Sequence, residues 1–302
     1  MTAFDLISAQ SRQQDGPDVQ RERGAMPRLL RRLPVNAWLA ALILIVYVVV
    51  AIFAPAISPF SPTEIFVGSP FQSPDNVYWL GTDNLGRDVL SRVLYGSRTI
   101  LLMAGSAAAI SAILGGLIGM FLGYLGGVVD EICMRALEII MSIPSIIFAL
   151  LIVGIVGASG PLVSVTVGLL AVPNVSRVMR AAAQQVAAED FIAAARARGE
   201  TRLSIVLREI LPNVAGTLIV EFSIRTGYAI LFIGGLGFLG FGATPPTPDW
   251  GLMVNEGRGT IDASIWPVAA PAVCMAVLVT TVNIFTDGIT RILGPADTGR
   301  TA

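Results

Sequence analysis

Two oppositely charged residues stand four positions apart inside a long apolar stretch. Glu221 and Arg225 share one face of a helix at that spacing and can neutralise each other as an ion pair. An unpaired charge at the centre of a membrane costs about 2.5–3.5 kcal/mol. A structural ion pair is therefore the favoured interpretation, and a site for a charged solute is the alternative.

A second charged constellation precedes another apolar stretch. Asp83, Arg87, Asp88 and Arg92 alternate in sign, with Gly81 and Gly86 permitting tight turns between them. Arg87 and Asp88 can pair locally. The pattern from Arg87 onward is typical of an amphipathic helix, and it favours a structural role over a catalytic one.

The residues that most enzymes depend on are missing from this chain. It contains no histidine, so the commonest general base and the commonest metal ligand are absent. All 20 basic residues are arginine, and a phosphate-binding P-loop requires lysine. Cys133 and Cys274 stand in apolar surroundings without disulfide or metal spacing. We therefore expect no catalysis, metal or cofactor in this chain.

Composition indicates an integral membrane protein. Of 302 residues, 54% are hydrophobic and 14% are charged, against roughly 25% charged in a typical soluble domain. Apolar stretches near the length of about 20 residues that a membrane span needs recur along the chain. The predicted spans are 37–54, 99–123, 137–156, 161–178, 218–242 and 265–286. Pro144 interrupts the third of these spans. The predicted fold is an all-α polytopic membrane protein with six transmembrane helices.

The arginines predict how the chain is oriented. If the N-terminus lies inside, 15 arginines fall on the inner side, four fall in the outer segments 55–98 and 244–264, and Arg225 lies in a span. Basic residues are enriched on the cytoplasmic side of membrane proteins. This bias places both termini and the polar segment 189–213 in the cytoplasm.

The segment 189–213 has the pattern of a helix, a turn and a second helix. Asp190 is a suitable N-cap for a helix that begins at Phe191, and Gly199 suits a left-handed stop. Thr201 can cap the next helix, which we expect Pro212 to end. An amphipathic surface helix of any kind would show the same periodicity.

This segment resembles the cytoplasmic coupling loop of ABC importer permeases, in which a short helix docks on an ATPase. Small residues followed by glycine, and then Leu-Pro, carry the resemblance. It implies docking roles for Phe191, Ala193, Ala194, Ala195, Arg196, Gly199, Leu211 and Pro212. Ala193 stands where the family motif has glutamate, so that polar contact is either absent or supplied by Glu189 or Asp190.

The outer segments resemble the oligopeptide/dipeptide branch of these permeases, and specifically its C-type subunit. The stretch WLGTDNLGRDVLSRVLYGSR, 79–98, is similar to the signature of that branch. Its signature residues are Gly81, Thr82, Asp83, Gly86, Arg87, Asp88, Ser91 and Arg92. The second outer loop, 240–258, also resembles this branch, and Trp250 in it is expected to anchor at the interface. The resemblance implies a structural lid or a contact with a solute-binding protein.

Two apolar spans carry distinctive small residues. The second has a stripe at intervals of four, which favours close packing within the chain, with a subunit interface as the alternative. The stripe consists of Ala107, Ser111, Gly115, Gly119, Gly123 and Gly127. The fifth is rich in glycine and phenylalanine, which suits a pathway-lining helix and tight packing equally. Candidate lining residues are Phe232, Gly235, Phe238 and Phe241.

The resemblance also implies the organisation of the chain. A cytoplasmic tail, 1–35, would precede an OppC-type region, 36–98, a MetI-like type I importer core, 99–290, and a second cytoplasmic tail, 291–302. The implied partners are a second, homologous permease subunit in a heterodimer, one or two ABC ATPase subunits that bind ATP and Mg, and an extracytoplasmic solute-binding protein. The implied location is the bacterial inner membrane, with lipid contacts and no nucleic acid.

Three hypotheses about function follow. The favoured one is a subunit that forms half of an ATP-driven import pathway, with a peptide or another small polar solute as cargo. Relatives carry peptides, nickel, glutathione or sugar-linked compounds, and the absence of histidine and of paired cysteines disfavours nickel. The alternatives are an ion-coupled secondary carrier that needs no ATPase, and a membrane scaffold that transports nothing.

Overall fold

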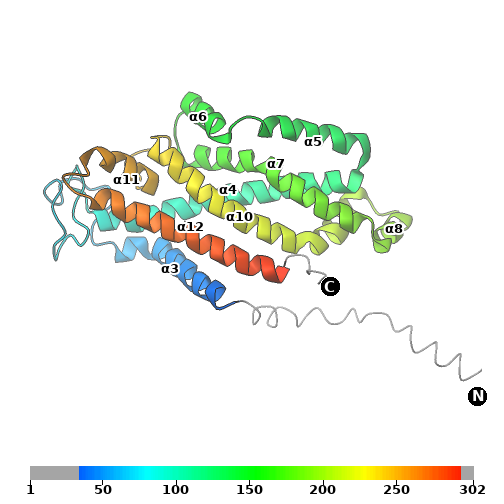
Figure 1. Ribbon diagram of the computed structural model, residues 1–302, viewed down its shortest axis with the longest axis horizontal. Helices are drawn as coiled ribbons and strands as arrows, with labels where there is room; N and C mark the ends of the chain where they lie inside the picture. The colour runs from blue at the N-terminus through cyan, green and yellow to red at the C-terminus, as the bar shows by residue number, and fades with distance from the viewer. Residues whose placement is uncertain (1–33, 294–302) are drawn as a thin grey trace, which may run out of the picture.

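A computed structural model describes residues 34–293, and its regular secondary structure is almost entirely helical (Figure 1). Within that range, β-structure is limited to one isolated bridge between Thr82 and Asp88. The all-α prediction is thereby confirmed. Most of the two tails predicted at 1–35 and 291–302 lies outside the described residues.

Five helices are long and apolar enough to cross a membrane. They are α3 (Val35–Ile57), α4 (Val89–Leu125), α7 (Gly160–Ala187), α10 (Leu211–Phe238) and α12 (Trp266–Leu293). At a rise of 1.5 Å per residue, even the 23-residue α3 is about 34 Å long, which exceeds the roughly 30 Å of the hydrocarbon layer. The helices α4, α7, α10 and α12 form the body, and α3 lies along one side of it (Figure 1).

The predicted third span is not a single straight helix. Its sequence is divided between α5 (Gly127–Met141) and α6 (Ser145–Val156), and the two helices are bent by 78°. Pro144 lacks a backbone N–H and disfavours helical geometry at Ile143, so the helix ends before it. With 12 residues, α6 is about 18 Å long and does not span by itself. The pair is therefore a broken span or a re-entrant loop.

The small-residue stripe packs α4 against α7. A Cβ atom on Gly119 would lie 2.4 Å from the carbonyl oxygen of Ser176, and one on Gly123 would lie 2.6 Å from that of Arg180. The two backbones therefore touch, which confirms the intramolecular interpretation of the stripe. Gly127 does not belong to it, because α4 ends at Leu125 and Gly127 begins α5.

This contact gives a prediction about stability. We expect Gly119→Ala to lower the free energy of unfolding by about 1–3 kcal/mol, because the new methyl group overpacks the α4–α7 contact. Gly105→Ala on the same helix is the matched control, since its Cβ would meet nothing within 4 Å. Thermal unfolding of the purified chain in detergent measures both. Equal melting temperatures for the two variants would refute the close approach.

The predicted outer helix and the second span are one element. The 37-residue α4 begins directly after Asp88, whose carboxylate accepts a hydrogen bond from the Ser91 N–H.

The helix α11 (Trp250–Gly257) packs across α4. Trp250 is 1% exposed and donates from Nε1 to the Val93 carbonyl at 3.0 Å, so its prediction as an interfacial anchor is wrong. Gly96 leaves the space that the indole occupies.

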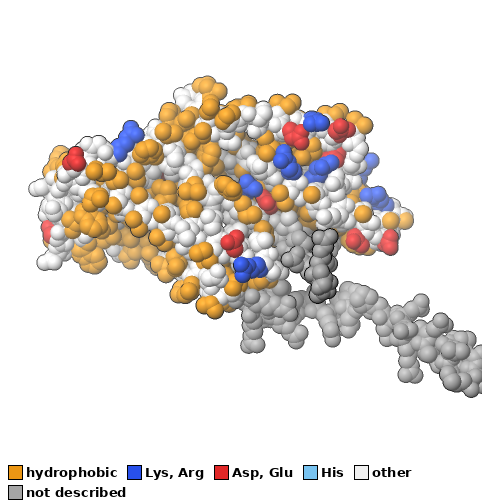
Figure 2. All heavy atoms as spheres, viewed as in Figure 1, with side chains coloured by type: hydrophobic (Ala, Val, Ile, Leu, Met, Phe, Trp, Pro, Cys, Tyr) orange, Lys and Arg blue, Asp and Glu red, His pale blue; other side chains and the backbone are white. Residues whose placement is uncertain are grey.

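The two segments predicted to carry function lie at opposite ends of the body. The loop 58–88 and α11 lie at one end, and the short helix α8 (Asp190–Ala197) lies at the other (Figure 1). On the face shown in Figure 2, charged side chains gather towards the α8 end, while apolar side chains cover much of the middle. We call the end that carries the loop 58–88 and α11 the α11 end, and the end that carries α8 the α8 end.

Candidate functional site

The helix α8 is short because both of its ends are specified locally. Its N-cap is Glu189 and not Asp190 as predicted, and Glu189 makes no side-chain capping bond. At the other end Gly199 has φ +79° and donates its N–H to Arg196, while Glu200 donates to Ala195. These two bonds form a Schellman motif, which glycine favours because it adopts positive φ without strain. The predicted left-handed stop at Gly199 is thereby confirmed.

The two faces of α8 differ in burial. Ile192 and Ala195 are fully buried and pack in an apolar cluster with residues that include Ile205 and Val206. Phe191, one turn before Ala195 at the edge of the buried face, is 40% exposed. The remaining exposed residues among those predicted to dock are Ala193, Ala194, Arg196, Gly199 and Pro212. Within this chain, Ala195 thus holds α8 on the body, and its neighbours are free for a partner.

Charged groups fix the turn that follows α8. Arg196 places its guanidinium carbon 4.7 Å from the centre of the Tyr124 ring, a cation–π contact between α8 and α4. Arg198 donates to Glu200 at 2.6 Å, and Ser204 donates to the other carboxylate oxygen. The hydrogen bond from Arg198 lowers the pKa of Glu200, so this carboxylate stays ionised at neutral pH. Glu189 and Asp190, the proposed substitutes for the missing motif glutamate, are both exposed.

The segment after the turn continues into α10 without a break. Thr201 caps α9 (Arg202–Ser204) by accepting from the Ser204 N–H, as predicted. The chain then forms a π-helix, η2 (Ile205–Ile210), and enters α10. Pro212 therefore does not end the helix, because it lies in the first turn of α10, where its missing N–H is tolerated. Leu211 is half-buried beside it. A π-helix is rare and often marks a functional region.

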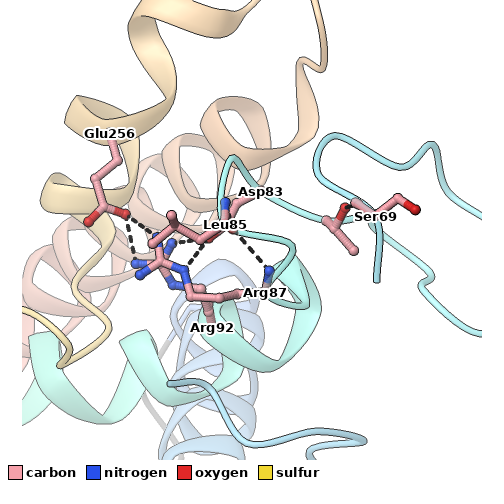
Figure 3. A network of polar contacts seen from close by, with 7 residues as sticks. Ser69, Asp83, Leu85, Arg87, Arg92 and Glu256 are labelled. Carbon is pink, nitrogen blue, oxygen red and sulfur yellow. Dashed lines mark hydrogen bonds and ion pairs between the residues drawn. The ribbon is translucent and has the colours of Figure 1, made fainter. Parts of the chain in front are cut away.

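At the α11 end, two arginines share two carboxylates (Figure 3). Asp83 accepts from Arg87 and from Arg92, each at 2.6 Å. Glu256 of α11 accepts from the same two arginines at 2.8 and 2.9 Å. Asp83 and both arginines are at most 5% exposed, and Glu256 is 23% exposed. We call these four residues the ionic cluster; it joins the loop 58–88, α4 and α11.

The cluster corrects the pairing expected from the sequence. Arg87 pairs with Asp83 and Glu256 and not with Asp88, which instead caps α4. The predictions also missed Glu256. Its position six residues after Trp250 gives no local signal, although an acidic residue in the second outer loop could have been considered as a partner for Arg87 or Arg92.

The remaining signature residues fold the loop around the cluster. A Cβ atom on Gly81 or Gly86 would lie 2.3 Å from a backbone carbonyl oxygen, and both residues have positive φ. Thr82 donates to the Ser69 carbonyl and accepts from the Gln72 N–H. Ser91 links Asp88 to the backbone of Phe60. The signature therefore specifies a rigid surface.

Two carboxylates in these loops have shifted pKa values. The backbone N–H groups of Tyr78 and Val77 lower the pKa of Asp75, which forms an exposed turn. Burial raises the pKa of Asp249, which caps α11 by accepting from Leu252 at 2.9 Å. Asp249 also lies against Gly237 of α10, where a Cβ would be 2.6 Å from its carboxylate. Part of the glycine content of α10 thus reflects close packing.

The four candidate pathway residues do not converge on one space. Phe232 lines a cavity of about 290 Å³ among α4, α6, α7 and α10. The Phe238 ring lies 5.2 Å from the guanidinium carbon of Arg258, and the Phe241 ring lies near Gly154. A Cβ on Gly235 would meet nothing within 4 Å. Glu221 and Arg225 form the predicted ion pair, with Nε 3.1 Å from Oε2.

Comparison with known proteins identifies the family. Residues 115–296 match the family described as "Binding-protein-dependent transport system inner membrane component". The dipeptide transport permease DppC of Haemophilus influenzae is 32% identical, over 86% of this chain and 90% of that protein. The glutathione transport permease GsiD of Escherichia coli O6:K15:H31 is 34% identical, over 86% of each chain. In fold, the chain is similar to one from the inward-facing MetNI methionine ABC transporter. That match has a TM-score of 0.53 at 20% identity and covers 68% of this chain and 97% of that chain.

The chain belongs to the family of binding-protein-dependent inner membrane transport components. It is a multi-pass permease subunit of an ABC importer of the oligopeptide/dipeptide type, C-type subunit, and is not itself an enzyme. Such a system includes an ATPase and a solute-binding protein, and the permease subunits of this family carry no cofactor.

Proposed function

We propose that this chain forms half of the import pathway for short peptides and receives the motion of an ATPase through the segment 189–213. The relatives it matches are named for dipeptide, di/tripeptide and glutathione transport. All of these cargoes are short peptides. Selection among them falls largely to the solute-binding protein.

The observation that carries this proposal is the placement of α8. Its buried face, Ile192 and Ala195, packs in one apolar cluster with η2 and the start of α10. Its exposed face points away from the body. A push on α8 is therefore passed through η2 directly into a membrane-spanning helix. Rigid-body motion of this kind can switch a cavity between outward and inward access.

The proposal extends to the assembly around the chain. The α8 end faces the cytoplasm, where both termini lie and where one or two ATPase subunits dock. The rigid surface at the α11 end faces the solute-binding protein. A second, homologous permease subunit completes the pathway. In this organisation the tails 1–35 and 291–302 flank the region 36–98 and the core 99–290.

An ion-coupled carrier is the alternative function. Such a carrier needs an acidic group in the membrane that binds and releases the driving ion. Glu221 is the acidic residue near the middle of α10, and it is paired with Arg225. This pairing disfavours the alternative. A scaffold that transports nothing is the third hypothesis.

Reconstitution separates these functions. The complex purified with its ATPase partners is placed in proteoliposomes with its solute-binding protein, and uptake of radiolabelled dialanine is measured. We expect uptake that requires both ATP and the binding protein. Uptake driven by an ion gradient without ATP would support the carrier, and binding without uptake would support the scaffold.

A further inference from the structure

A cavity with a mixed polar and apolar lining lies beside the Glu221–Arg225 pair and opens to the surface of the chain, where Ser145 and Tyr228 are exposed. It has a volume of about 290 Å³, near the lower limit of roughly 300 Å³ for small-ligand pockets. Helices α4, α6, α7 and α10 all contribute to its wall. The polar lining residues are Ser111, Ser145, Asn174, Arg225 and Tyr228.

Arg225 lies close to the centre of α10. It is 14 residues after Leu211 and 13 before Phe238, so it stands about 20 Å from either end of the helix. The helix begins before the predicted span 218–242 does, and this places the pair in the middle of α10. A cation within a membrane-spanning helix is costly unless it has a partner.

The ion pair uses only part of the hydrogen-bonding capacity of Arg225. Within the described residues, its one side-chain hydrogen bond runs from Nε to Glu221. A guanidinium carries five N–H donors in a planar fork, and the two terminal nitrogens can grip a carboxylate together. Tyr228 supports the guanidinium from 5.4 Å, a contact that leaves those nitrogens unoccupied. The side chain of Arg225 remains 17% exposed, while that of Glu221 is 7% exposed.

We infer that Arg225 is a binding residue for the carboxylate of the transported solute. Glu221 neutralises the guanidinium while the cavity is empty, and a solute carboxylate then takes the terminal nitrogens. Asn174 and Ser145 supply further polar contacts in the same cavity. This inference rests on the proposed import function and specifies the cargo as a solute with a free carboxylate.

A double variant separates this role from a purely structural pair. Glu221→Gln/Arg225→Gln removes both charges together, so no ion is left unpaired in the membrane. We expect ATP-dependent uptake of dialanine by the reconstituted complex to fall at least about tenfold, the effect of one lost charged hydrogen bond. ATP hydrolysis stimulated by the binding protein persists, because α8 is untouched. Glu221→Gln alone leaves Arg225 unpaired but available to the solute, and we expect it to retain more uptake than the double variant. Wild-type uptake by the double variant would overturn the inference.

A second measurement does not depend on transport. Phenylglyoxal modifies accessible arginines, and mass spectrometry of the wild-type complex reports the rate at each site. We expect sodium acetate to slow modification of Arg225 several-fold relative to acetamide with sodium chloride at equal ionic strength. Arg135, whose side chain is 76% exposed, is the reference that stays unchanged. Equal rates at Arg225 in both solutions, or no modification there at all, would overturn the inference. Failure of the wild-type complex to import dialanine would instead count against the proposed function.

Discussion

Phe191→Asp is expected to abolish ATP-driven uptake while the chain still inserts and folds. Phe191 is a large apolar residue, 40% exposed, at the edge of the buried face of α8. Loss of an aromatic anchor at a protein interface costs about 2–4 kcal/mol, which weakens binding of the ATPase roughly 30- to 1000-fold. Dialanine uptake and the amount of ATPase that co-purifies with the chain measure the effect.

Two matched variants define what this result means. Arg135→Asp also adds negative charge on an exposed face, but on α5, and it should leave uptake unchanged. Phe191→Tyr keeps the aromatic ring and should retain most of the uptake. If Phe191→Asp transports at the wild-type rate with a normal complement of ATPase, α8 is not the docking element.

Asp83→Asn is expected to have the largest effect on stability. Asp83 is 4% exposed and is shared by Arg87 and Arg92, so its neutralisation leaves two buried guanidinium groups with one carboxylate. Removing one partner of a buried ion pair typically costs about 3–5 kcal/mol. We expect Asp83→Asn to lower the free energy of unfolding by this amount. Thermal unfolding of the purified chain in detergent gives the difference.

The control for Asp83→Asn is a carboxylate in an exposed pair. Glu138 accepts from Arg135 at 3.1 Å, and both side chains are largely exposed, so Glu138→Gln should change stability by about 0–1 kcal/mol. The prediction fails if Asp83→Asn and Glu138→Gln unfold alike. Glu256→Gln should lie between them, because Glu256 is partly exposed and Asp83 remains to hold the arginines.

The parts of the fold that depend on local composition were predictable. The apolar stretches predicted α3, α10 and α12 to within about two turns at each end, because a membrane-spanning helix needs a predominantly apolar sequence. Gly199 gave the end of α8 correctly, since a left-handed residue after a helix is usually glycine. The stripe of small residues on α4 correctly predicted close packing within the chain, because small side chains allow the α7 backbone to approach.

Features that depend on tertiary partners were not predictable from one sequence. Glu256 meets Arg87 only because α11 folds back across α4, which no local spacing encodes. Trp250 was predicted to be an interfacial anchor, but its indole is buried in a space that exists because residue 96 is glycine. Pro212 looked like a helix end, but the π-helix η2 before it carries the chain smoothly into α10. In the first two cases a contact distant in sequence decided the outcome, and in the third a rare local helix type did.

The most direct test of the account is the side and accessibility of α8. Ala194, an exposed residue of α8, is replaced by cysteine in a Cys133→Ala/Cys274→Ala background and treated with a membrane-impermeant maleimide. We predict labelling in inverted vesicles stripped of the ATPase, protection when the ATPase is restored, and no labelling in right-side-out vesicles. Labelling in right-side-out vesicles, or equal labelling with and without the ATPase, would contradict the coupling role of α8.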